Sequence, residues 1–316
     1  MRPGAPRLGA GEGLDERVQA VERAAPAGVG PAGGAAAPAV PGGLLWRRLR
    51  RHRLAVAGGL IVLAVGALAI LAPALVAADP TAIDVDQILA RPSRLHWFGT
   101  DDFGRDLLAR VIYGTRLSLV VGVSVLVVTL LLGGFSGVLA GVTAAADAVI
   151  MRAMDALMAF PAILLALAVM AVAGPATANV VVALGIAYAP RMARLARASV
   201  LTVRSREYIE AARALGAPPW RIVRLHIVPN ALAPLIVQGT FTFGYAILGE
   251  AALSFVGLGA VPPTPSLGNI LADARPVMRD APWMIILPSL TLSLTILGLN
   301  LFGDGLRDVL DPRMRL

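Results

Sequence analysis

The chain contains no cysteine, and it carries few charges of either sign. Without cysteine, disulfide bonds, thiol catalysis and cysteine-ligated metal sites are all excluded. Charged residues make up 15% of the 316 residues, whereas a soluble domain carries about 25%. Hydrophobic residues reach 57%, the mean hydropathy is +0.74, and the apolar residues come in long runs. The composition therefore predicts a membrane protein with lipid as the solvent for much of its surface.

Lysine is also absent, so all 28 basic residues are arginines and the formal net charge is +8. A basic balance is typical of nucleic-acid binding, but most of these arginines flank apolar segments, which the positive-inside rule explains better. We therefore expect no nucleic-acid partner. The three histidines, His52, His96 and His226, lie far apart in the sequence, so we expect structural roles for them and neither a metal site nor a cofactor.

Six apolar segments predict an all-α integral membrane fold with six transmembrane helices. Runs of about 20 apolar residues span a bilayer as helices. They lie at about 54–78, 117–142, 154–173, 179–196, 232–256 and 282–303. Arginines at 47–53 precede the first run, and residues 197–230 hold six arginines against Glu207 and Glu210. Both segments should therefore be cytoplasmic, which places the N- and C-termini inside.

The expected organisation follows from these runs. It comprises a disordered Ala/Gly/Pro-rich cytoplasmic tail (1–43), a basic anchor with the first transmembrane helix (44–78), an extracytoplasmic segment (79–115), a transmembrane domain (116–303) with a cytoplasmic loop at 205–230, and a cytoplasmic C-terminal tail (304–316).

The loop at 205–230 predicts a helix, a glycine and a second short helix. Ser205 is a suitable N-cap, and Glu207 and Glu210 fall early in the helix, where negative charge suits the helix dipole. Gly216 can adopt positive φ and end the helix. These features leave two roles open: an amphipathic connector on the membrane surface, or a docking element for a cytoplasmic partner.

One motif in this loop resembles a known family. Glu210-Ala211-Ala212, followed by Gly216 and then Pro229, is similar to the EAA loop of ABC importer permeases. The segment before Pro229 reads His226-Ile227-Val228, which resembles the dipeptide, oligopeptide and nickel branch more than the general pattern. Further blocks that resemble the same branch are HWFGTDDFGRDLLARVIYGTRLSL (96–119), LGEAALSFVGLGAVPPTPSLGNIL (248–271) and LNLFGDGLRDVLDPR (299–313).

The resemblance implies a C-type permease with the type I importer fold in a bacterial plasma membrane. The expected partners are a second permease in a heterodimer, cytoplasmic ATPase subunits and an extracytoplasmic solute-binding protein. Glu210, Ala211, Ala212, Gly216 and Pro229 would then couple the chain to the ATPase. The solute would be a peptide, nickel or a related compound.

Polar residues in or near the predicted spans have two interpretations. Glu250, Asn300 and Gln238 either line a translocation path or have structural roles, because intramembrane polar groups are costly and face protein or water. Asp101, Arg105 and Asp106 outside the membrane either pair with each other or meet the binding protein, and we favour the structural role because GTDxxGRD also offers a turn and a capped helix start.

No catalytic motif is present in the sequence. It lacks the G-x-x-x-x-G-K-[ST] phosphate loop, H-E-x-x-H and a nucleophile elbow, so we expect ATP hydrolysis in partner subunits and no enzyme in this chain. Two alternatives stay open. An ion-gradient-driven secondary transporter would need buried carboxylates at mid-membrane, where Glu250 stands alone. A membrane-embedded enzyme would need an acid/base or metal cluster.

Overall fold

A computed structural model describes residues 47, 49–76 and 78–310 of the chain, all within one compact unit, Ala39–Leu316. The described part is helical and contains no strand. Its principal helices are α3 (Arg53–Ile70), α4 (Ala72–Leu75), α5 (Leu107–Thr129), α6 (Phe135–Val142), α7 (Ala144–Met158), α8 (Ala162–Ala173), α9 (Thr177–Arg204), α10 (Glu207–Ala214), α11 (Pro219–Ile222), α12 (Val228–Phe255), α13 (Leu267–Ala274) and α14 (Trp283–Leu310). The predicted tail at 1–43 lies outside the described residues.

Four helical stretches are long and apolar enough to cross a membrane: Arg53–Ile70, Leu107–Val142, Pro219–Phe255 and Trp283–Leu310. A π-helical segment, Leu130–Gly134, joins α5 to α6 within the second of them. The pair α7 and α8 would make a fifth span if it crosses as one unit. Helix α9 has 28 residues but is less apolar, because Arg191, Arg194 and Arg197 lie in its second half. The described fold is therefore an all-helical membrane protein with four to five candidate spans.

The structure changes several helix boundaries that the sequence suggested. The third run, 154–173, is not one straight helix, because α7 and α8 meet at an angle of 89° around Ala159–Pro161. Pro161 lacks the N–H that would continue α7 and instead precedes the first residue of α8. Helix α5 begins at Leu107, inside the segment 79–115 that was expected to be extracytoplasmic. Helix α14 continues to Leu310, beyond the expected end at 303.

Small residues bring the helices into close contact. A Cβ on Gly58 of α3 would collide with the backbone of α14 at Phe302, so the two helices approach closely along their length. On α6, a Cβ on Gly137 would collide with the Ala193 carbonyl of α9. In lipid, helix association depends on such close packing because the bilayer supplies no hydrophobic drive between helices.

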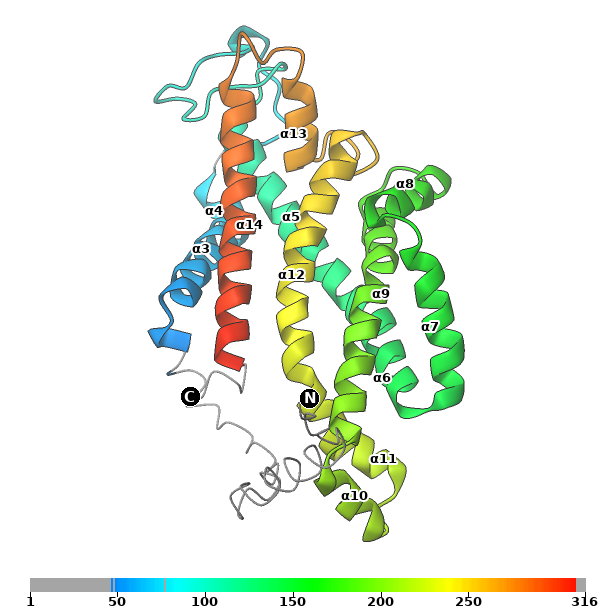
Figure 1. The fold of residues 1–316 in the computed structure, drawn as a ribbon. Coiled ribbons are helices and arrows are strands. Elements are labelled where there is room, and N and C mark those ends of the chain that lie inside the picture. The colour runs from blue at the N-terminus through cyan, green and yellow to red at the C-terminus, as the bar shows by residue number, and fades with distance from the viewer. Residues whose placement is uncertain (1–46, 48, 77, 311–316) are drawn as a thin grey trace, which may run out of the picture. The chain divides into compact units, whose positions relative to one another are not determined.

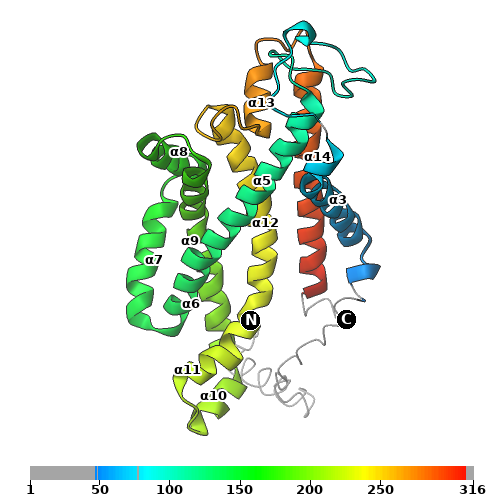
Figure 2. The ribbon, with the colours of Figure 1, turned by 180° about the vertical axis from the view of Figure 1, so that it is seen from behind.

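The bundle has two distinct ends (Figures 1 and 2). Helices α10 and α11 project from one end, beyond the last turns of α9 and the first turns of α12. At the opposite end, α13 lies beside the upper part of α14, and the irregular segment before α5 lies above both. The loop at 205–230 and the segment at 79–106 are therefore separated by the length of the spanning helices.

Candidate functional site: the helix–Gly–helix loop and the polar clusters

A two-bond cap ends helix α10 at the position the sequence predicted. Gly216 has φ of +77°, in the left-handed region that favours glycine. The Gly216 N–H donates to the Arg213 carbonyl at 2.9 Å, and the Ala217 N–H donates to the Ala212 carbonyl at 3.0 Å. These bonds form a Schellman motif, which ends a helix by satisfying its last carbonyls. Gly216 thus fixes the turn between α10 and α11.

The start of α10 differs from the expectation. Its N-cap residue is Arg206, which makes no side-chain cap. The Ser205 hydroxyl instead donates to the Thr202 carbonyl at 3.1 Å, on the last turn of α9. A serine side chain one turn from a helix end can bond back to a preceding carbonyl as readily as forward to an N–H. Ser205 is therefore a C-terminal residue of α9 and not the cap of α10.

The motif residues present a low, exposed surface. Glu210, Ala211, Gly216 and Pro229 are exposed, and Ala212 is half-buried. The small side chains of the two alanines let another protein approach the helix backbone. These residues share the loop, but Pro229 lies in the first turn of α12, which follows α11 after the π-helical turn Val223–Ile227.

The opposite face of α10 is fixed to the bundle. Ile209 is fully buried in a cluster with Val203, Ile222 and Ile227, which come from α9, α11 and the π-helical turn Val223–Ile227. Burying such side chains contributes about 1.5–3 kcal/mol each. Ile209 therefore packs α10 against α9, α11 and the turn that precedes α12.

Two arginines of α9 connect this region to α6 and α7. Arg204 donates through Nη1 to the Gly141 and Val142 carbonyls at 2.6 and 2.9 Å, which caps the C-terminus of α6. Arg197 pairs with Asp147 of α7, its Nη2 lying 2.6 Å from Oδ2. Arginine suits such sites because its planar fork can serve two acceptors at once. Helices α6 and α7 are thus both bonded to α9.

Glu250 is enclosed between two helices. Its side chain is on α12, and the residue is 1% exposed. Ser254 Oγ donates to Oε1 at 2.7 Å, one turn along the same helix, and Ser118 Oγ of α5 donates to Oε2 at 2.7 Å. Both carboxylate oxygens therefore have a donor inside the protein, as a buried acidic group requires.

The other two polar candidates lie apart from Glu250. Gln238 is half-buried and lines a cavity between α9, α12 and α14. Asn300 is exposed on α14, with its Oδ1 about 3.6 Å from where a Cβ on Gly244 of α12 would lie. The structure therefore does not gather Glu250, Asn300 and Gln238 into one site.

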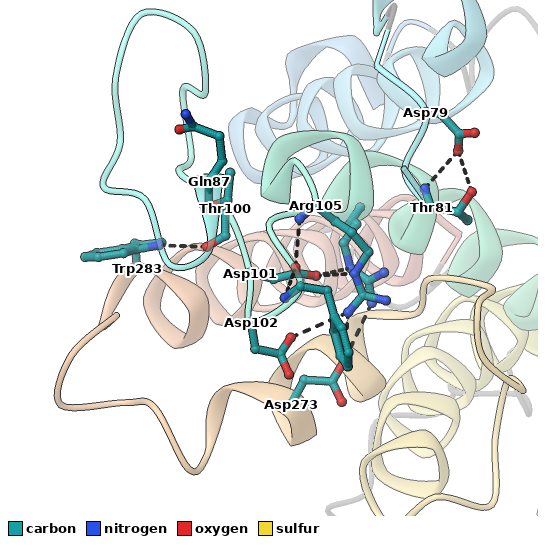
Figure 3. Close-up of polar contacts among 11 residues, drawn as sticks. Asp79, Thr81, Gln87, Thr100, Asp101, Asp102, Arg105, Asp273 and Trp283 are labelled. Carbon is teal, nitrogen blue, oxygen red and sulfur yellow. Dashed lines mark hydrogen bonds and ion pairs between the residues drawn. The ribbon is translucent and has the colours of Figure 1, made fainter. Parts of the chain in front are cut away.

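A charged cluster joins the segment before α5 to α13 at the other end of the bundle (Figure 3). Asp101 is its centre: the carboxylate lies 2.6 Å from Arg105 Nε and 3.2 Å from Arg110 Nε. Asp273 of α13 lies 3.8 Å from Arg105 and 3.7 Å from Arg110, and Asp102 lies 3.5 Å from Arg105. The cluster links residues about 170 positions apart in the sequence.

The expected pairing of Asp101 with Arg105 is present, and Asp106 caps α5 by accepting from the Ala109 N–H at 2.8 Å. Asp106 also lies 2.8 Å from His96 Nδ1. The turn before the helix needs glycine, because Gly104 has φ of +73° and a Cβ there would collide with Asp84. The GTDxxGRD pattern thus builds a turn and a capped helix start.

Sequence reasoning missed Arg110 and Asp273 as members of this cluster. Arg110 lies inside an apolar helix at 3% exposure, where Asp101 and Asp273 are its ion-pair partners. No local signal marks Asp273. Burial raises the pKa of the Asp273 and Asp102 carboxyls, each partly opposed by neighbouring arginine charge.

The chain is an all-helical membrane protein. It carries the helix–Gly–helix loop at one end and the charged cluster around Asp101 at the other. Residues 129–316 match the family described as binding-protein-dependent transport system inner membrane component, and residues 41–92 match the N-terminal TM domain of oligopeptide transport permease C. The chain belongs to this permease family, in the C-type branch of the oligopeptide and dipeptide ABC transporters. It is a multi-pass inner membrane subunit without a catalytic role of its own.

Relatives cover most of the chain. The dipeptide transport system permease protein DppC of Alkalihalophilus pseudofirmus is 44% identical over 271 residues, which cover 85% of this chain and 89% of that protein. The glutathione transport system permease protein GsiD of Pectobacterium atrosepticum is 45% identical, with coverages of 85% and 90%. The di/tripeptide permease DppC of Pseudomonas aeruginosa is 43% identical, with coverages of 85% and 91%.

The fold is shared with a solved transporter. A chain of the MetNI methionine ABC transporter, in inward facing conformations, superposes with a TM-score of 0.54. The sequences are 24% identical, and the match covers 64% of this chain and 97% of that chain. The likeness shows the importer permease fold and nothing about the solute.

Proposed function

We propose that this chain is the permease subunit of a peptide importer and that its α10–α11 loop receives the motion of a separate ATPase. The observation that carries the solute class is the set of relatives at 43–45% identity, which are named for dipeptides, di/tripeptides and glutathione. These solutes share a peptide backbone with free charged ends. Nickel, also expected from the branch, finds no support among these names.

The coupling assignment rests on the two faces of α10. Its outer face offers Glu210 and small alanines, and its inner face is anchored through buried Ile209. Coupling requires two states with different contacts at both sites. We assign the ATPase contact to Glu210, Ala211, Ala212 and Gly216, and we give Pro229 the role of starting α12 directly after the loop.

The expected partners follow from the family. An extracytoplasmic binding protein would deliver the peptide at the α13 end, a second permease would complete the path as a heterodimer, and two ATPase subunits would close in the cytoplasm. ATP-driven closure would then alternate the bundle between outward and inward openings.

The proposed topology has six crossings with both termini in the cytoplasm. Four crossings are the helical stretches that are long and apolar enough to span a membrane. Helices α7 and α8 form the fifth as a bent pair, and α9 forms the sixth despite its arginines. The arginines of α9 lie toward its α10 end, where the positive-inside rule places the cytoplasm.

Charge reversal at Glu210 tests the coupling role. The complete importer, with both permeases, ATPases and binding protein, would be reconstituted in liposomes, and peptide uptake and ATP hydrolysis measured together. Because Glu210 is exposed, Glu210→Lys should leave insertion intact while it lowers copurification of the ATPase and reduces uptake at least tenfold. Asp304→Lys, which changes an exposed acidic residue of α14 outside the α10–α11 loop, serves as the matched control. Unchanged uptake by the Glu210 variant would refute the assignment.

The solute class has a separate test. Uptake of labelled dipeptide, glutathione and nickel should be compared in the same liposomes with the cognate binding protein. We expect ATP-dependent accumulation of at least one of the two peptides and none of nickel. Accumulation driven by an ion gradient without ATP would instead support a secondary transporter.

A further inference from the structure

A cavity of about 660 Å³ lies between α9, α12 and α14 in the half of the bundle near α10. Side chains of all three helices and of the α9–α10 junction line it. The lining residues include Leu195, Thr202, Arg206, Asn230, Phe241 and Arg307. A volume of this size is typical of sites that hold a small organic molecule.

The charged residues that line the cavity are both arginines. Arg206 and Arg307 both border the cavity, and none of the acidic residues that the structure describes lines it. Within the described part of the chain, neither guanidinium forms an ion pair. Arg197 pairs with Asp147 and Arg204 caps α6, whereas the exposed Arg213, Arg221 and Arg224 of this end have, like the two cavity arginines, no ion pair among the described residues. The two cavity arginines are therefore available to a negatively charged ligand.

The polarity of the lining changes with depth. One side of the lining runs from Leu195 on α9 to Arg206 just past the end of α9, and the other runs along the antiparallel α12 from Phe241 to Asn230, eleven positions in each case. At 1.5 Å per residue this spans about 16 Å. Arg206 and Arg307 lie near the ends of the spanning helices, whereas Leu195, Val237 and Phe241 lie deeper, with Gln238 as a polar group among them. A ligand that fits this gradient has an anionic head and an apolar tail.

We propose that this cavity binds an anionic phospholipid, with its phosphate between Arg206 and Arg307 and an acyl chain along α9 and α12. Guanidinium groups bind phosphate with parallel N–H donors. Basic pockets between spanning helices commonly accept the head groups of anionic lipids. A free phosphate would leave the apolar depth unfilled, and a zwitterionic lipid would leave one arginine less well neutralised.

The test uses the complete importer purified in mild detergent and transferred to nanodiscs containing phosphatidylglycerol and phosphatidylcholine. Retained lipid is then counted by native mass spectrometry after release into detergent. The wild type should retain phosphatidylglycerol, the Arg206→Gln/Arg307→Gln variant should retain at least tenfold less, and each single variant an intermediate amount. Arg224→Gln, an exposed arginine outside the cavity, should match the wild type.

A second variant probes the apolar half independently. Val237→Trp should fill the cavity beside Phe241 and lower phosphatidylglycerol retention while both arginines stay in place. Equal retention by the wild type and the double arginine variant would overturn the proposal. The proposal would also be overturned if the double arginine variant lost bound dipeptide and kept its lipid, because the cavity would then belong to the solute path. Glu210→Lys should keep the lipid, so failure of the coupling role would not be confused with failure here.

Discussion

At the scale of single residues, Gly216 holds a backbone conformation that few side chains adopt. A Cβ there would meet nothing within 4 Å, so the only cost of a substitution comes from its φ of +77°. We expect Gly216→Ala to strain the loop by about 1–2 kcal/mol and to lower peptide uptake per ATP hydrolysed. Gly216→Asn should retain more coupling, because asparagine tolerates the left-handed region. Equal coupling in glycine, alanine and asparagine forms would contradict a role for this turn.

Glu250 allows its two interpretations to be separated by a pair of substitutions. Glu250→Ala would leave the buried Ser118 and Ser254 hydroxyls without their acceptor, at a cost of about 1–3 kcal/mol each. Glu250→Gln keeps the volume and one acceptor oxygen. If the role is structural, the thermal midpoint should fall for alanine, and uptake should persist for glutamine. A glutamine variant that is stable but transports nothing would instead show that the charge serves the path.

At the scale of helices, close packing between α6 and α9 depends on glycine. A Cβ at Gly137 would collide with backbone atoms of α9, which cannot move as a flexible side chain would. We expect Gly137→Ala to destabilise the bundle by about 1–3 kcal/mol, measured as a lower thermal midpoint in detergent. Gly66→Ala on α3 is the control, because nothing lies within 4 Å of its Cβ, and it should stabilise the helix by about 0.8–1 kcal/mol. Equal midpoints for the two variants would refute this account.

The bend between α7 and α8 is a second feature of this scale. An apolar run and a proline are visible in the sequence at 154–173, but an angle of 89° is not. A proline permits a break, and the contacts of α8 with α9 then decide the direction of the next helix.

At the scale of the whole molecule, the absence of cysteine makes the proposed topology directly testable. Single cysteines at Arg94, Pro175 and Leu215, all exposed, would each be the only thiol in the chain. We expect an impermeant maleimide to label Arg94→Cys and Pro175→Cys in intact cells, and Leu215→Cys only after permeabilisation. Labelling of Pro175→Cys from the cytoplasmic side alone would make α7 and α8 a re-entrant pair and reduce the number of crossings.

The sequence by itself determined that lipid surrounds much of the chain. It also determined most of the apolar helices and the loop built around Gly216. These features are local: an apolar run, a glycine at a helix end and a capping aspartate at 106 act on neighbours a few residues away. The resemblance in the same loop supplied the family, which the comparisons confirmed.

Only the tertiary structure decided which distant groups meet. Arg110 lies against Asp273, Glu250 lies against Ser118, and Arg206 shares a cavity with Arg307 because of how each helix is rotated and where it crosses its neighbours. In a membrane, those rotations follow from close backbone packing at small residues such as Gly58 and Gly137. An apolar run looks the same at every rotation about its axis, so the pattern of hydrophobic residues in the sequence could not specify these contacts.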